Sequence, residues 1–231
     1  ITHKQEDRLL LAYIPEVSNM LGFKTQQKMV TKVLQAQWRI SNFTTIFVKK
    51  MVRPYISDMS YVTKFRPNRL AHGIYELDNR LFASYKLKIQ TIDTLLEILV
   101  SLPDRFYHFD AGFLNQFTYT NISYPLKAKT NLLLKELLQK ESMYCYLKLF
   151  YDAGILHQLF SNFRKVLHLP QFDGYHQYPV DIHSIESVKA LENISEQNIQ
   201  ELYNELNLDE RLILKIVTLF HDTGKGRTQD H

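Results

Sequence analysis

Apolar side chains recur every three to four residues along most of this 231-residue chain, the spacing of helices with one buried face. The longest such stretch spans 25–52, and we expect Pro54 to end it. Its apolar stripe, which we expect to be buried, consists of Met29, Val33, Ala36, Ile40, Phe43 and Phe47, widened by Trp38 and Ile46. Shorter helices are predicted at 5–13, 15–21, 92–102, 111–117, 126–139, 144–152, 156–166, 180–193, 196–206 and 210–222.

Residues 61–77 have a different pattern, in which the turn signals Pro67-Asn68 and His72-Gly73 separate short apolar stretches. This pattern is typical of a small β-hairpin. Elsewhere turn formers are scarce: the chain has seven Gly and seven Pro, about half the ordinary usage. That scarcity argues against sandwiches, barrels and doubly wound sheets, which need many tight turns.

We therefore predict an all-α fold in two parts. The first is a helical, bundle-like connector domain over 1–169 that carries the hairpin near 61–77. The helix-breaking segment 170–174 then leads into a second helical domain over 170–231.

Charge and cysteine content narrow the function classes. Lys plus Arg is 28 and Asp plus Glu is 24, and the net charge of +4 comes without a basic cluster, so no nucleic-acid partner is expected. Cys145 is the only cysteine and is expected to be buried, so no internal disulfide can form. No apolar run approaches the ~18 residues of a membrane span. We expect a cytoplasmic protein without a membrane partner. Because the sequence begins with Ile1 and ends soon after its most informative segment, we also expect a piece of a longer protein.

The candidate chemistry lies in the second part. His221 and Asp222 follow each other at the end of a predicted apolar helix, and His183 lies 38 residues upstream on another predicted helix. Adjacent residues at a helix end can both reach one ion, and a third ligand must come from another element. Imidazole nitrogen and carboxylate oxygen suit a divalent transition metal, and Mg²⁺ is an option where oxygens and waters dominate. We therefore predict His183, His221 and Asp222 as metal-binding and catalytic residues.

Neighbouring residues fit a phosphoester substrate. Lys225 could neutralise a phosphate oxygen, and we count it among the catalytic residues, although a solvated lysine at a helix end is the plain alternative. Gly224 and Gly226 would let the backbone come close to a ligand. His231 is a further candidate metal ligand. Asp181 either orients His183 or is an ordinary acid of a helix's first turn.

Two segments carry a family resemblance: YPVDIH at 178–183 and LFHDTGKGR at 219–227. They resemble the HD superfamily of metal-dependent phosphohydrolases and, within it, are similar to the bacterial protein-PII uridylyltransferase/uridylyl-removing enzymes. The resemblance implies an all-helical HD domain whose metal, Mg²⁺ or Mn²⁺, is held by His183, His221 and Asp222, with the family's last Asp beyond His231, so that the HD domain is truncated.

The resemblance also implies a function in nitrogen regulation. In that family the HD domain removes UMP from a tyrosine of the signalling protein PII, a separate domain attaches UMP from UTP, and ACT domains sense glutamine. Ile182, Thr223 and Thr228-Gln229 depart from the family pattern, and none is a predicted ligand. Two alternatives stay open: an HD phosphohydrolase acting on nucleotides or nucleic-acid ends, and a helical scaffold or regulatory piece without activity.

Overall fold

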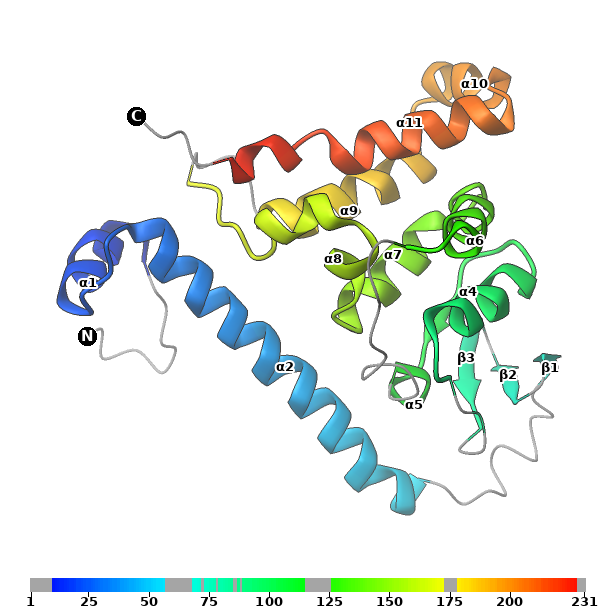
Figure 1. The fold of residues 1–231 in the computed structure, drawn as a ribbon, viewed down its shortest axis with the longest axis horizontal. Helices are drawn as coiled ribbons and strands as arrows, with labels where there is room; N and C mark the ends of the chain where they lie inside the picture. Colours follow the sequence, from blue (N-terminus) through cyan, green and yellow to red (C-terminus); the bar gives the residue numbers. More distant parts are fainter. Residues whose placement is uncertain are drawn as a thin grey trace.

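The computed structural model describes residues 10–56, 68–71, 73–77, 79–84, 87, 89–114, 126–172 and 178–227. Helices dominate it, and one small sheet lies at the edge of the molecule, below the chain's C-terminal helices in this view (Figure 1). The all-α prediction with a small β element is confirmed. The α-helices are α1 (Ile14–Met20), α2 (Gln26–Ile56), α4 (Ile92–Ser101), α5 (Ala111–Leu114), α6 (Ala128–Leu138), α7 (Met143–Asp152), α8 (Leu156–Leu159), α9 (Val180–Glu192), α10 (Gln197–Glu205) and α11 (Leu208–Phe220). Three 3₁₀ turns complete them: η1 (Leu11–Tyr13), η2 (Ser161–Lys165) and η3 (Thr223–Gly226).

The sheet is larger than the predicted hairpin. Its strands β1 (Asn68–Ala71), β2 (Ile74–Leu77), β3 (Arg80–Ala83) and β4 (His108–Phe109) lie in sequence order. The first three are antiparallel, and the short β4 pairs in parallel with β3. The two hairpin turns use left-handed backbone at Gly73 and Asn79, residue types that tolerate positive φ. The predicted turn is therefore confirmed at Gly73, whereas His72 and residues 61–67 of the predicted hairpin lie outside the described residues.

The core is built around α7. Eight of its ten residues are buried, including Cys145 at 2% exposure, as predicted. Burial raises the pKa of the Cys145 thiol to about 12, so it stays a protonated, inert side chain at neutral pH. Helix α7 packs on α9, and α9 in turn packs on α11. Buried side chains on both sides of residue 170 join one cluster, which holds α9 and α11 in a fixed arrangement; the domain boundary at 169/170 stays a prediction.

The long helix α2 corrects one expectation. Met29 is buried, but the later part of the predicted stripe faces solvent: Ala36 is exposed, and Ile40, Phe43 and Phe47 are 65%, 68% and 50% exposed. The helix also continues through Pro54 to Ile56, because a proline in the last turn removes only one helical hydrogen bond.

Another face of α2 contacts the body of the protein. The Trp38 indole packs edge-on against Tyr151, with ring centroids 6.1 Å apart, and the Asn42 side chain donates to the carbonyl of Asp152 at 2.9 Å. Residues 38 and 40 point about 200° apart on a helix, so burial of Trp38 leaves Ile40 on the solvent side. The periodicity correctly predicted the helix but not which face is covered.

Gly154, which follows α7, leaves room for the Trp38 indole to pack against the body of the protein. Its φ is +70°, and a Cβ there would lie 3.2 Å from Cη2 of Trp38. We expect Gly154→Ala to lower the free energy of unfolding by about 2–3 kcal/mol, from left-handed strain plus the indole contact. Gly22 is the matched control, because it has the same φ of +70° and open space around its Cβ position. Urea denaturation should give a smaller loss for Gly22→Ala; equal losses would contradict the packing role of Trp38.

Two smaller corrections concern other predicted elements. The predicted helix over 156–166 is divided into α8 and η2, since Phe160 between them has an extended backbone. The predicted helix at 111–117 is described only as α5, and most of the one predicted at 5–13 lies outside the described residues, which begin there with η1. None of the helices in the described ranges is long and apolar enough to cross a membrane.

Candidate metal centre

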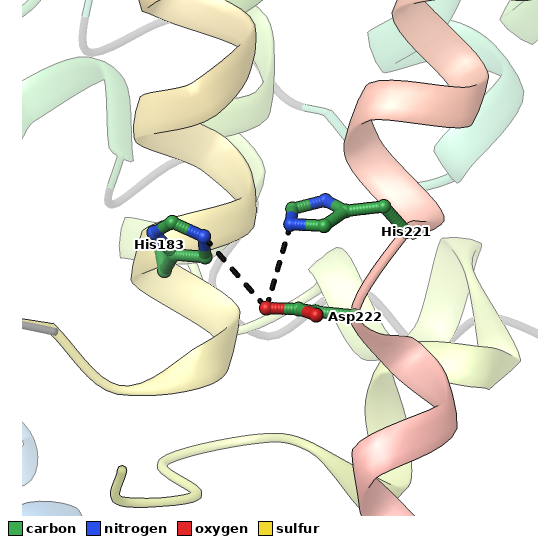
Figure 2. Close-up of side chains that lie close together, drawn as sticks. All are labelled: His183, His221 and Asp222. Carbon is green, nitrogen blue, oxygen red and sulfur yellow. Dashed lines mark ion pairs between the residues drawn. The ribbon is translucent and has the colours of Figure 1, made fainter. Parts of the chain in front are cut away.

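Two helices bring the predicted ligands together. His183 lies in the first turns of α9, and His221 and Asp222 follow directly after α11 (Figure 2). Nε2 of His221 is 3.4 Å from Oδ2 of Asp222, and Nε2 of His183 is 3.7 Å from the same oxygen. The two imidazole rings pack edge to face, with their centroids 5.3 Å apart. Residues 38 positions apart thus form one cluster, as predicted.

The end of α11 orients the His221 ring. Nδ1 of His221 lies 2.7 Å from the carbonyl oxygen of Thr218, which can only accept a hydrogen bond, so Nδ1 carries the proton. That assignment leaves the lone pair on Nε2, the nitrogen that faces Asp222. Metal-binding histidines commonly have a carbonyl or carboxylate partner of this kind on their other nitrogen. The carbonyl-rich end of a helix also favours positive charge nearby.

Asp222 is held by a cation. Nζ of Lys225 donates to Oδ2 of Asp222 at 2.8 Å and to Oε1 of Gln171 at 2.6 Å. Burial alone would raise the pKa of Asp222, but the hydrogen bond from Lys225 and the charges of His221, Lys225 and His183 outweigh it. The pKa of Asp222 therefore lies below its ordinary value, and the carboxylate is ionised at neutral pH. Sequence reasoning missed Gln171, because a glutamine in a linker carries no recognisable signal.

The geometry fits one divalent ion. A bond from such an ion to imidazole nitrogen or carboxylate oxygen is about 2.0–2.2 Å long, so two ligand atoms of one ion lie within roughly 4.4 Å of each other. Both distances to Asp222 satisfy this limit, and the three ligand atoms taken together lie within 4.8 Å of one another, slightly more than the limit. The side chains of Asp222, His183 and His221 are 14%, 28% and 39% exposed, which leaves water and substrate access to the open side of the cluster.

Gly226 has a packing role. A Cβ at Gly226 would lie 2.7 Å from Cβ of Lys165 and 2.9 Å from its carbonyl oxygen. Gly226 is therefore needed for the packing of η3 on η2, and the approach of a phosphate to the two glycines stays a prediction. Gly224 has open space around its Cβ position and lies in η3 without left-handed backbone, so nothing in its surroundings requires glycine.

The carboxylate of Asp181 accepts hydrogen bonds from backbone N–H groups around the start of α9. It is fully buried in the first turn of α9, and its Oδ2 accepts the backbone N–H of His168 at 2.7 Å. Together with the bond from Val180 N to Leu169 O, this anchors the start of α9 to the preceding segment. The predicted further ligand His231 lies outside the described residues.

Comparisons with curated proteins find relatives in the family that the two sequence motifs resemble. Among curated proteins, the chain is 24% identical to the bifunctional uridylyltransferase/uridylyl-removing enzyme of Bradyrhizobium diazoefficiens over 99% of its own length and 27% of the relative's. The enzyme of the same name from Rhodopseudomonas palustris is also 24% identical, over the whole chain and 28% of the relative. The chain is a homologue of the bifunctional uridylyltransferase/uridylyl-removing enzymes.

The similarity covers only part of the length of these relatives. A third such enzyme, from Zymomonas mobilis, is 33% identical over a shorter stretch of 90 residues, which covers 37% of this chain and 10% of the relative. The chain thus spans about a quarter of the length of the uridylyltransferase/uridylyl-removing enzymes that it matches from end to end. No family model matches it, and no solved structure matches it significantly.

Proposed function

We propose that the chain carries a metal-dependent phosphodiesterase site, and that its substrate is the uridylyl-tyrosine of the signalling protein PII, from which UMP is released. The observation that carries the proposal is the convergence of His183, His221 and Asp222 from two helices beside Lys225. Homology to enzymes named as uridylyl-removing supports the choice of substrate. A role in nitrogen regulation follows from that substrate.

The residues of this site would have different roles in hydrolysis. His183 and His221 would each offer an imidazole nitrogen, and Asp222 an ionised carboxylate oxygen, so that together they would hold Mg²⁺ or Mn²⁺. Such an ion acts as a Lewis acid and lowers the pKa of a coordinated water. Lys225 offsets negative charge on the phosphoryl oxygens. Attack by water on phosphorus then forms one P–O bond and breaks the bond to the tyrosyl oxygen, which leaves with a proton as tyrosine.

A chromogenic diester tests the proposal on the chain as it is. Uridine 5′-(4-nitrophenyl phosphate) contains the same bond between UMP and a phenol oxygen. With Mn²⁺ present, we expect release of UMP and 4-nitrophenolate by the wild-type chain and loss of that release in His221→Ala. Hydrolysis that persists in His221→Ala would overturn the site assignment.

Two further outcomes decide between the functions. No hydrolysis by the Mn²⁺-loaded wild-type chain would favour an inert helical scaffold. Faster hydrolysis of free nucleotides or of a 3′-phosphorylated oligonucleotide than of uridylylated PII would favour the broader nucleotide phosphohydrolase.

Lys225 is expected to act on the substrate and not on the metal. Replacement by methionine removes the ammonium group and keeps the length of the side chain. A charged hydrogen bond to a phosphoryl oxygen contributes about 1.5–3 kcal/mol, so we expect KM for the nitrophenyl diester to rise about tenfold or more in Lys225→Met. Affinity for Mn²⁺, measured by calorimetry, should change far less. An unchanged KM would show that Lys225 serves only to hold Asp222.

A further inference from the structure

A cavity separate from the candidate metal centre lies where α2 contacts the body of the protein. It measures about 230 Å³, and its lining includes Trp38 and Arg39 of α2, Tyr151 at the end of α7, His157 of α8 and His168. Tyr151, Leu156 and Leu167 give it an apolar wall next to the indole. Its volume lies somewhat below the roughly 300–1,000 Å³ of drug-sized sites, which limits it to a small ligand.

The indole that lines the cavity carries a hydrogen-bond donor without an acceptor. Nε1 of Trp38 is buried, and none of the described residues accepts a hydrogen bond from it. A buried N–H group without a partner costs about 1–3 kcal/mol, so such groups are rare.

The polar lining is rich in hydrogen-bond donors. The cavity is lined by Gln35, Arg39, His157 and His168, and none of its described lining residues is Asp or Glu. The nearest carboxylate recorded at these groups is that of Asp181, which lies behind His168 with Oδ2 3.6 Å from Nδ1. Burial lowers the pKa of His157 and of His168, and the charges of Arg164 on the first and of His157 and Arg39 on the second lower them further. Both histidines are therefore neutral at neutral pH, and Arg39 is the one cation among the described lining residues.

The backbone at the cavity is strained as well. His168 is only 4% exposed and has a φ of +57°, a left-handed conformation uncommon outside glycine. The bond from its N–H to Asp181 holds it there, with its ring 5.5 Å from that of Trp38. Conformations of this kind persist where the surroundings fix them, and they concentrate at ligand sites.

We propose that this cavity binds a small organic anion, a carboxylate or phosphate group on a planar apolar body. The anionic head pairs with Arg39 and accepts hydrogen bonds from the cavity histidines, while the body packs against Trp38 and Tyr151. The inference concerns a different set of residues from the metal centre and does not depend on the proposed function.

Fluorescence tests the site directly, because Trp38 is the only tryptophan in the chain. The wild-type chain is titrated with phenyl phosphate, with benzoate and with neutral benzyl alcohol, and N-acetyl-tryptophanamide corrects for collisional quenching. We expect a saturable change in emission with at least one of the anions and none with the alcohol, and the better anion identifies the head group. No saturation with either anion, or an equal response to the alcohol, would overturn the proposal.

Two arginine variants locate the binding. Arg39→Gln is expected to weaken binding of the better anion at least tenfold, whereas Arg80→Gln, an exposed arginine of β3, should leave it unchanged. If circular dichroism shows that Arg39→Gln does not fold, His157→Gln takes its place with the same expected loss. Unchanged affinity in the cavity variant, or equal weakening in Arg80→Gln, would contradict binding at this cavity.

Discussion

Replacing Lys215 by methionine is expected to lower the free energy of unfolding by about 3–5 kcal/mol. Lys215, on α11, is 2% exposed, and all three of its ammonium donors are used: by Glu192 at 2.9 Å and by the carbonyls of Lys140 and Glu141 at 2.8 and 2.7 Å. Methionine fills the same space but leaves the buried Glu192 carboxylate and two carbonyls without this partner. Urea denaturation measures the loss.

The loss should depend on pH. Burial raises the pKa of Glu192 above its ordinary value, while Lys215 acts in the opposite direction. Without Lys215, the pKa of Glu192 in the native state rises further above its value in the unfolded chain. At low pH the native variant therefore binds a proton on Glu192, which offsets part of the cost of the unpaired buried carboxylate. This offset is lost as the pH rises through the native-state pKa of Glu192. We therefore expect a larger loss at pH 8 than at pH 5.

An exposed pair provides the matched control. Lys189 is 51% exposed and lies 3.4 Å from Glu186 on α9, and surface pairs of this kind contribute about 0–1 kcal/mol. Lys189→Met should therefore have a small effect at both pH values. A loss in Lys215→Met as small as the one in Lys189→Met would contradict the buried ion pair.

The second large effect is expected at the metal centre. Asp222→Asn keeps the shape of the side chain but removes the charge that both histidines face, and we expect Mn²⁺ affinity to fall roughly a hundredfold or more, with loss of diester hydrolysis. Asp209→Asn is the control, because Asp209 lies at the other end of the same helix, with its side chain 72% exposed. Calorimetric titration with Mn²⁺ compares the three proteins. Equal affinities in wild type and Asp222→Asn would contradict the ligand assignment.

The sequence predicted the candidate metal-binding cluster because its three residues lie near the ends of regular helices. The apolar periodicity predicted α9 and α11, and His221 lies at the C-terminal end of α11, whose start is set by the capping box of Asn207 and Glu210. The pairing of these helices depends on packing around α7, which no local pattern reveals. Gln171 and the contact of Gly226 with Lys165 are long-range consequences of that packing.

Because local patterns do not reveal which elements pack together, the buried face of α2 was predicted wrongly. A stripe of apolar residues predicts a covered face only if the partner element is known, and in this helix Trp38 and Asn42 make the contact to the body. The cavity beside Trp38 could not be predicted either, because its residues come from four separate segments and their donors meet only in the folded chain.

The central claim is that His183, His221 and Asp222 hold one divalent ion, and pulsed electron paramagnetic resonance of the Mn²⁺-loaded wild-type chain tests it most directly. The account predicts one bound Mn²⁺ per chain with couplings to two histidine nitrogens, one of which disappears in His183→Ala and the other in His221→Ala. A spectrum without nitrogen couplings, or one that neither substitution changes, would contradict it.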